Sequence, residues 1–241
     1  MAIASQSILV EEKQDGFLIK VDGTPLKTPA GATILLPTKR LAQAMVAELV
    51  TVEEIDPSRL GFYCLASTRL DFTDKGKSIP VEGIPKIILF DPALHALPGS
   101  ALDVLESATE PVRSFLAGHG LVHPEIPNLP ENEMEGWLAD SPSETKHNIE
   151  GILRVCRDLF EKQGNAQHAV VINAGKVHRS FVLGLLLAEG QISTAEYAAA
   201  VMATLCIHPL AWNNIGVDQY RAAFEEVRLQ ADSMRVYLEE N

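Results

Sequence analysis

The chain has 241 residues, of which 46% are hydrophobic, and a formal net charge of −12 at pH 7. This length and apolar content suffice to bury a sizeable core in one or two domains. Because a surface that binds nucleic-acid phosphates needs clustered Lys and Arg, the excess of acids argues against general nucleic-acid binding. The net negative charge fits a protein with a basic client, but the acids are dispersed along the chain, which favours an ordinary solvated surface.

No segment predicts membrane insertion. The longest apolar run, near residues 181–188, is far shorter than the roughly 18–20 residues that a membrane span requires. The N-terminal segment contains Glu11 and Glu12 in place of an apolar or Arg-rich targeting sequence. We therefore expect a location in the bacterial cytoplasm, or in the mitochondrial matrix if the protein is eukaryotic.

The first elements are predicted to be short strands. Residues 17–21 partly alternate between apolar and polar and are followed by Asp22-Gly23, a strong hairpin signal. Residues 25–29 lead to a second turn at Ala30-Gly31, and residues 33–36 have the composition of a third strand. Together they predict a small antiparallel meander.

A helix is predicted directly after the strands. Thr38 follows Pro37 and is a plausible N-cap. The apolar residues of this helix fall on one face, which we expect to cover the sheet: Leu41, Met45, Val46 and Leu49.

Helical periodicity dominates the rest of the chain after a linker at about residues 72–85. Residues 87–90 fit either a short strand or the start of a helix. An amphipathic helix is predicted from Leu102 through Val112 and Leu116 to about residues 118–120. A Pro-rich connection follows at residues 124–130. Ser141-Pro142-Ser143-Glu144 then resembles a capping box with Pro at the first helical position, before a helix that ends near Gly164.

Three more helices are predicted near the C-terminus. They cover about residues 175–188, the segment from a capping box at Ser193–Glu196 through Leu205, and about Val217–Glu239. The predicted fold is therefore α+β, with a small antiparallel β-rich N-terminal domain and packed helix at residues 1–78. A mainly α-helical, orthogonal-bundle domain is predicted at residues 79–241.

The sequence favours a protein without catalytic chemistry, metal or organic cofactor. The spacing of the cysteines (Cys64, Cys156, Cys206) fits neither a disulfide framework nor a zinc site. His119 and His123 flank Gly120 and precede Pro124, so they lack the helical geometry of a zinc-binding pair. An enzyme that uses these histidines, or His178 beside Arg179, is the less favoured alternative.

The segments from Gly16 to Asp71 resemble the assembly chaperones of the F-type ATP synthase. The family is the Atp-twelve type, which handles the alpha subunit of the catalytic sector. The following segments match its order and spacing: Asp22-Gly23, Pro25-Leu26-Lys27-Thr28-Pro29, Leu36-Pro37-Thr38, Ala47-Glu48 and Ile55-Asp56-Pro57. A weaker similarity covers residues 181–193, and Glu110-Pro111 is similar to the family's Trp-Asp-Pro segment.

The resemblance implies a chaperone that binds the free alpha subunit reversibly and covers its apolar assembly surface, because large exposed apolar patches promote aggregation. It also implies that Glu48 and Trp212, which match family motifs, contact the client.

The sequence departs from the family pattern at three places. Leu49 and Thr109 occupy positions where the family usually has Trp, and residues 204–209 replace an acidic stretch that is implicated in client binding. These departures leave open a diverged protein-interaction module with a different client.

Overall fold

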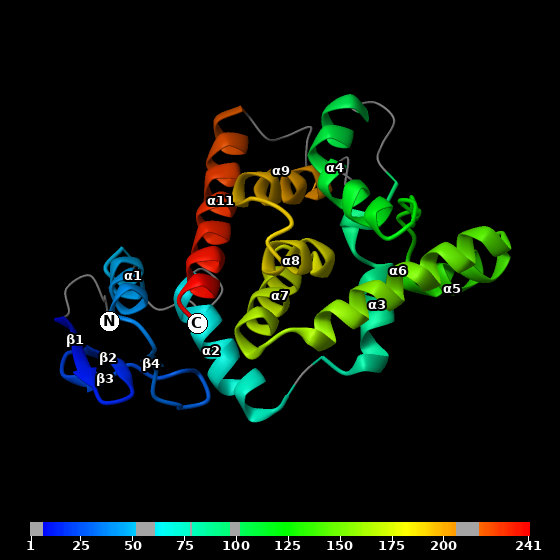
Figure 1. Ribbon diagram of the computed structural model, residues 1–241. Helices are drawn as coiled ribbons and strands as arrows, with labels where there is room; N and C mark the ends of the chain where they lie inside the picture. The colour runs from blue at the N-terminus through cyan, green and yellow to red at the C-terminus, as the bar shows by residue number, and fades with distance from the viewer. Residues whose placement is uncertain (1–6, 52–60, 78, 97–101, 206–216) are drawn as a thin grey trace. The chain divides into compact units, whose positions relative to one another are not determined.

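The computed structural model describes residues 7–51, 61–77, 79–96, 102–205 and 217–241. Contacts within the chain group it into two compact units. The sheet unit comprises Met1–Ser78, Gly164–Asn173 and Asp232–Asn241, and the helical unit comprises Ile79–Gln163 and Ala174–Ala231. Figure 1 labels the elements of both. The division at residues 78 and 79 that the sequence suggests remains a prediction.

The sheet unit contains a four-stranded antiparallel sheet, as expected for an α+β protein. β2 (Gly16–Val21) pairs with β1 (Ile8–Lys13) along its whole length and with the short strands β3 (Thr24–Pro25) and β4 (Leu35–Leu36). The predicted Asp22-Gly23 hairpin is confirmed, because both residues have positive φ, as a tight primed turn requires. The sequence analysis missed β1, whose exposed and half-buried residues give no regular alternation.

Position 16 requires glycine because the backbone of β4 lies close to it. Its φ is +145°, and a Cβ at this position would lie 2.4 Å from the carbonyl oxygen of Leu36. Only glycine therefore permits β4 to pair at this end of β2.

Helix α1 (Lys39–Leu49) packs on the sheet through its predicted apolar face. The hydroxyl of Thr38 accepts a hydrogen bond from Leu41 N at 3.2 Å, which confirms Thr38 as the N-cap. The buried residues of the face are Leu41, Ala42, Met45 and Leu49, while Val46 is only half-buried. These side chains form the core of the unit together with Ile19, Ile34 and Leu36.

Helix α2 (Gly61–Asp71) completes the N-terminal part of the sheet unit, followed by the short η2 turn (Thr73–Lys75). Gly61 begins this helix, which the sequence analysis did not predict. The periodicity was uninformative because the six consecutive residues 62–67 are all buried. Gly61 faces α11, where an added Cβ would lie 2.9 Å from Cβ of Ser233.

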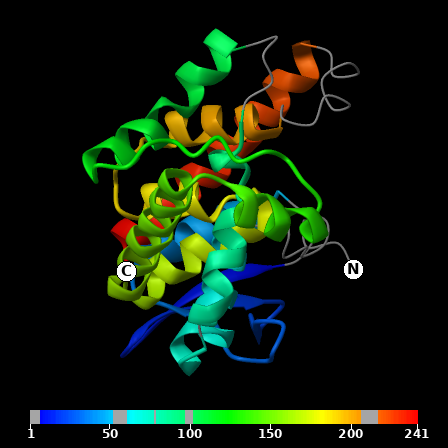
Figure 2. The same ribbon diagram turned by 90° about the vertical axis from the view of Figure 1, so that its right-hand side faces the viewer.

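The helical unit begins with η3 (Val81–Gly83), α3 (Ile84–Leu89) and η4 (Pro92–Leu94). Its longer helices are α4 (Leu102–Gly118), α5 (Glu131–Asp140), α6 (Ser143–Lys162), α8 (Phe181–Ala188) and α9 (Thr194–Leu205). All eight residues of α8 are buried, and this helix contacts α3, α4, α6 and α9. Figures 1 and 2 show α4 and α9 side by side.

Two further helices each have residues in both units. α7 (Asn165–Val177) begins in the sheet unit and ends in the helical unit, whereas α11 (Val217–Glu239) runs in the reverse order. The bounds of α11 are those predicted from the sequence.

The predicted capping box at residues 141–144 was wrong. Pro142 is the N-cap of α6 and makes no side-chain cap, because Ser141 instead ends α5 and donates its hydroxyl to Trp137 O at 2.7 Å. The single helix predicted at about residues 175–188 was also wrong. Arg179 has a φ of +58°, which breaks the chain into α7 and α8, and Ser180 caps α8.

Candidate protein-binding site

Glu48 does not have the geometry of a solvated surface charge. It lies near the end of α1, and its Oε2 accepts a hydrogen bond from Phe62 N at 2.8 Å, in the first turn of α2. A carboxylate at a helix N-terminus satisfies backbone N–H groups that have no partner within the helix and interacts favourably with the helix dipole. Glu48 therefore positions α2 within the sheet unit.

Burial of the Glu48 carboxyl group changes its acidity. The residue as a whole is half-buried, and the carboxyl is its more enclosed part because it faces the end of α2. Burial raises the pKa of Glu48 to about 7, against the lowering effect of hydrogen bonds from Phe62, Tyr63 and Gly61. Client contact by Glu48 remains a prediction, whereas its contact with α2 is structural.

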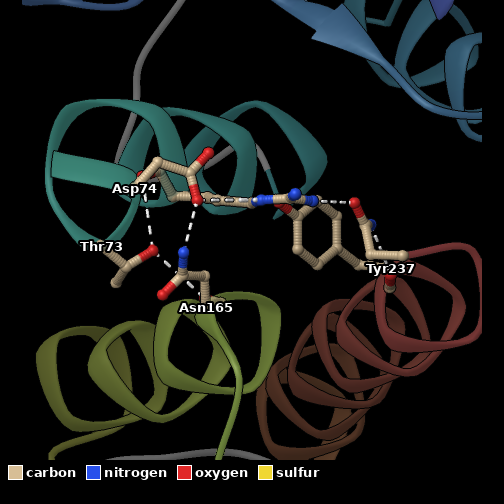
Figure 3. Close-up of polar contacts among 6 residues, drawn as sticks. Thr73, Asp74, Asn165 and Tyr237 are labelled. Carbon is tan, nitrogen blue, oxygen red and sulfur yellow. Dashed lines mark hydrogen bonds and ion pairs between the residues drawn. The ribbon is translucent and has the colours of Figure 1, made fainter. Parts of the chain in front are cut away.

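A polar network joins three chain segments of the sheet unit. Figure 3 shows Asn165, at the start of α7, donating from Nδ2 to Oδ1 of Asp74 at 2.9 Å, while the Thr73 hydroxyl donates to the Asn165 carbonyl at 3.2 Å. Arg69 Nε pairs with the same Asp74 oxygen at 3.3 Å and donates through Nη1 to Asn241. These contacts hold residues 165 and 241 at the C-terminal end of α2.

The Thr38 hydroxyl makes a second long-range contact with the C-terminal residues of the sheet unit. Besides capping α1, it donates to Oε2 of Glu240 at 2.6 Å, and Arg40 pairs with Oε1 of Glu240 at 2.8 Å. The hydrogen bond from Thr38 holds the pKa of Glu240 below its usual value. The family-like segment Leu36-Pro37-Thr38 thus secures the C-terminal residues of the same unit.

A cavity with a volume of about 1090 Å³ lies in the helical unit. We call it the α4 groove, because one side of α4 supplies most of its lining. The lining residues are Ser107, Ala108, Glu110, Pro111, Ser114, Phe115, Gly118 and His119 of α4, Leu159 of α6, Glu189 and Gln191 after α8, and Glu196 and Ala199 of α9.

The α4 groove combines apolar surface with three carboxylates. Glu110 accepts from the Ser114 hydroxyl at 2.8 Å, and Glu189 accepts from Gln163 Nε2 at 2.6 Å. Glu196 accepts from the backbone N–H and the hydroxyl of Ser193, both at 2.7 Å, which confirms that predicted capping box and lowers the pKa of Glu196. All these partners are neutral, so the bonds leave the negative charges uncompensated.

The sequence analysis did not identify this groove as a site, although two of its walls carried a signal. Glu110-Pro111 and the turn around Glu189 belong to the segments with weaker family similarity. Phe115, Leu159 and Ala199 gave no such signal, because nothing in a single sequence shows that residues of α4, α6 and α9 lie close together.

The cysteines, Trp212 and the other histidines singled out from the sequence are either buried or lie outside the described residues. Trp212 and Cys206 lie outside the described residues. Cys64 and Cys156 are buried and form no disulfide among the described residues, and the Cys64 thiol donates to Asn173 Oδ1 at 2.6 Å. His123 Nε2 bonds to the Ala93 carbonyl at 2.9 Å, and His178 lies between the Tyr197 hydroxyl and Gln230, so both serve buried packing. Among the described residues, no group of three or more His, Cys, Asp or Glu side chains could hold a metal ion.

Two departures from the family pattern lie inside the protein. Leu49 is 0% exposed and Thr109 is 2% exposed. Replacement of Trp at these positions therefore changes core packing and removes no exposed aromatic contact from the described surface. The changes at Leu49 and Thr109 are therefore weak evidence for a different client.

Comparison with known proteins confirms the family resemblance at the N-terminal region. Residues 5–90 match the sequence model of the ATP12 chaperone protein family. No match is found among curated proteins. No helix within the described ranges is long and apolar enough to cross a membrane.

The fold is similar to solved structures over almost the whole chain. Atp12 from Paracoccus denitrificans matches with a TM-score of 0.61 and 15% identity, covering 97% of this chain and 95% of the other. A candidate chaperone from Agrobacterium tumefaciens matches with a TM-score of 0.58 and 19% identity, covering 97% and 84%. At these identities the two structures show that the fold is shared.

Proposed function

We propose that this chain, which carries the ATP12 chaperone pattern in residues 5–90 and the Atp12 fold, binds the free alpha subunit of the ATP synthase catalytic sector. The family match is the observation that carries the proposal. The chaperone covers an apolar assembly surface of the subunit until the proper partner replaces it, since exposed apolar surface leads to aggregation. It acts in the compartment where the subunit assembles, the bacterial cytoplasm or the mitochondrial matrix.

The proposed activity requires surface complementarity and no bond-making step. The chain therefore needs no metal or organic cofactor for it. Binding must be reversible, so its energy is expected to reside in a few well-placed side chains surrounded by weaker contacts.

Light scattering of unfolded alpha subunit diluted into buffer tests the client. We expect a stoichiometric amount of the purified chain to suppress aggregation and to form a complex that size-exclusion chromatography resolves. An unrelated aggregation-prone protein serves as the control for client selectivity. No suppression and no complex with alpha subunit at tens of micromolar would reject this client.

A diverged protein-interaction module with another client is the second candidate. The altered residues 204–209 favour it, because they replace the acidic stretch of the family pattern. Affinity capture with the full chain from its native source, followed by mass spectrometry, separates the two candidates. Recovery of the alpha subunit in proportion to the bait supports the first one.

A further inference from the structure

Resting on the proposed chaperone function, we propose that the α4 groove receives a basic, amphipathic helical segment of the client protein. The size, charge and lining of the groove favour a segment of this class.

The size of the groove suits a helix. An α-helix with side chains is about 10 Å wide and rises about 1.5 Å per residue, so two turns occupy on the order of 900 Å³. The groove volume of about 1090 Å³ accommodates such a segment. Its apolar wall, which includes Ala108, Pro111 and Leu159, complements one apolar face of a helix.

The charge of the groove selects a basic segment. Glu110, Glu189 and Glu196 line it, and neither Lys nor Arg occurs among its lining residues. None of the three glutamates forms an ion pair within the described part of the chain. An acidic segment or a phosphate-bearing ligand would be repelled, whereas Lys and Arg would gain from electrostatic complementarity.

Two features of α4 add positions that suit a cationic side chain. Pro111 has no N–H, so the Ser107 carbonyl one turn earlier lacks the donor that an α-helix ordinarily supplies. Both residues line the groove. Phe115 and His119 form an edge-to-face pair with ring centroids 4.9 Å apart, and the Phe115 ring can bind a cation on its face.

Fluorescence anisotropy with labelled peptides tests the proposal on the full chain. The probe is a 16-residue helical peptide with a Leu and Ala face flanked by Lys, and its counterpart has Glu in place of every Lys. We expect the Lys peptide to bind at least about tenfold more tightly than the Glu peptide, with the difference decreasing at high salt. Equal binding of the two peptides would overturn the proposal.

Three variants locate the binding. Glu110→Lys reverses a charge in the groove, and Ala199→Phe reduces its volume from the α9 side. Both should weaken Lys-peptide binding by at least about fivefold. Glu150→Lys makes the same charge change on an exposed position of α6 outside the groove and should leave binding nearly unchanged. If Glu150→Lys weakens binding as much as Glu110→Lys, general electrostatic attraction explains the result and the groove is excluded.

The alpha subunit separates this proposal from the proposed function. If wild type suppresses aggregation and both groove variants do so equally well, the groove is not the client site although the function stands. If wild type binds the Lys peptide through the groove but does not bind alpha subunit, the helix-binding groove is supported and the client is wrong.

Discussion

Acidic side chains of the sheet unit and of the α4 groove differ in what their hydrogen bonds do. In the sheet unit, Glu48 bonds to Phe62, Asp71 bonds to Thr28, and Glu240 bonds to Thr38 across 202 residues. In the α4 groove, Glu110 and Glu196 bond to residues four and three positions away, and Glu189 bonds to Gln163 across 26 residues. None of these three acids is buried. The first group joins separate chain segments, while the second leaves charges at a surface. A carboxylate in a family motif can therefore report on folding instead of client contact.

The largest effect should come from a carboxylate of the helical unit that lies inside the core. Asp91 is buried and accepts from the Ser180 hydroxyl at 2.8 Å, from Val182 N at 2.7 Å and from Ala93 N at 3.0 Å. Asp91→Ala leaves these donors unsatisfied and should reduce the free energy of unfolding by about 3–5 kcal/mol. Urea unfolding measures the change.

Ser180→Ala is the matched control, because it removes one of these donors and keeps the carboxylate. Ser180→Ala should lower the free energy of unfolding by about 1–2 kcal/mol, which includes the loss of the α8 cap. If Asp91→Ala lowers the free energy of unfolding by less than about 1 kcal/mol, the buried carboxylate contributes little to stability. The distinction between buried acids and surface acids would then fail.

Glu48→Ala should have the next largest effect. It removes the acceptor at the N-terminus of α2, and we expect a loss of about 1–2 kcal/mol in the free energy of unfolding. This exceeds the effect of about 0.5 kcal/mol typical of an exposed helix charge. Glu48→Gln keeps an acceptor oxygen and should lose less than half as much. Hydrogen exchange of the α2 amides localises the change, and unaltered exchange in Glu48→Ala would contradict it.

The pH dependence of stability gives a third test of Glu48. Its pKa is raised from 4.5 to about 7 in the folded protein, so the folded state binds more protons between these pH values. The contribution of this raised pKa to the free energy of unfolding is fully present below pH 4.5 and is lost as the pH rises through about 7. Glu48→Gln lacks this titration. We expect the stability of wild type minus that of Glu48→Gln to fall between pH 4.5 and 7 in parallel urea titrations, and a rise would refute the assignment.

A smaller coupling should exist between Asp74 and Asn165. Their hydrogen bond of 2.9 Å is exposed, so a double-mutant cycle with alanine at both positions should give about 0.5–1 kcal/mol. A coupling of zero within error would show that the network in Figure 3 does not join the two chain segments energetically.

The groove residues should have the smallest effect on stability. Glu110→Gln and Glu150→Gln should each change the free energy of unfolding by less than about 0.5 kcal/mol, because both side chains are exposed. A loss comparable with that of Glu48→Ala would place Glu110 among the structural carboxylates and remove the distinction between the two groups.

Local sequence signals predicted those elements whose determinants lie within a few residues. The Asp22-Gly23 turn, the Thr38 cap and the Ser193–Glu196 capping box each depend on contacts over two or three positions. α2 was missed because burial on all sides erases helical periodicity. The box at Ser141 failed because the preceding helix α5 uses the same hydroxyl, and α5 itself was not predicted.

The candidate site was harder to predict than the fold. The family resemblance directed attention to Glu48, but its bond to Phe62 depends on α2, which begins 12 residues after α1 ends. The α4 groove depends on the packing of α4 and α9, which no local pattern encodes. Sequence reasoning therefore found a residue of interest and missed the contact that explains it.

The bond between Thr38 and Glu240 affects the order in which the chain can fold. The sheet and α1 are synthesised first, yet the segment that contains Glu240 leaves the ribosome only after about 190 further residues. Closing so long a loop is entropically unfavourable and slow, so the sheet unit should acquire its last contacts late. The helical unit ends at Ala231, so its chain is complete before that of the sheet unit, which begins at the N-terminus but also needs residues 232–241.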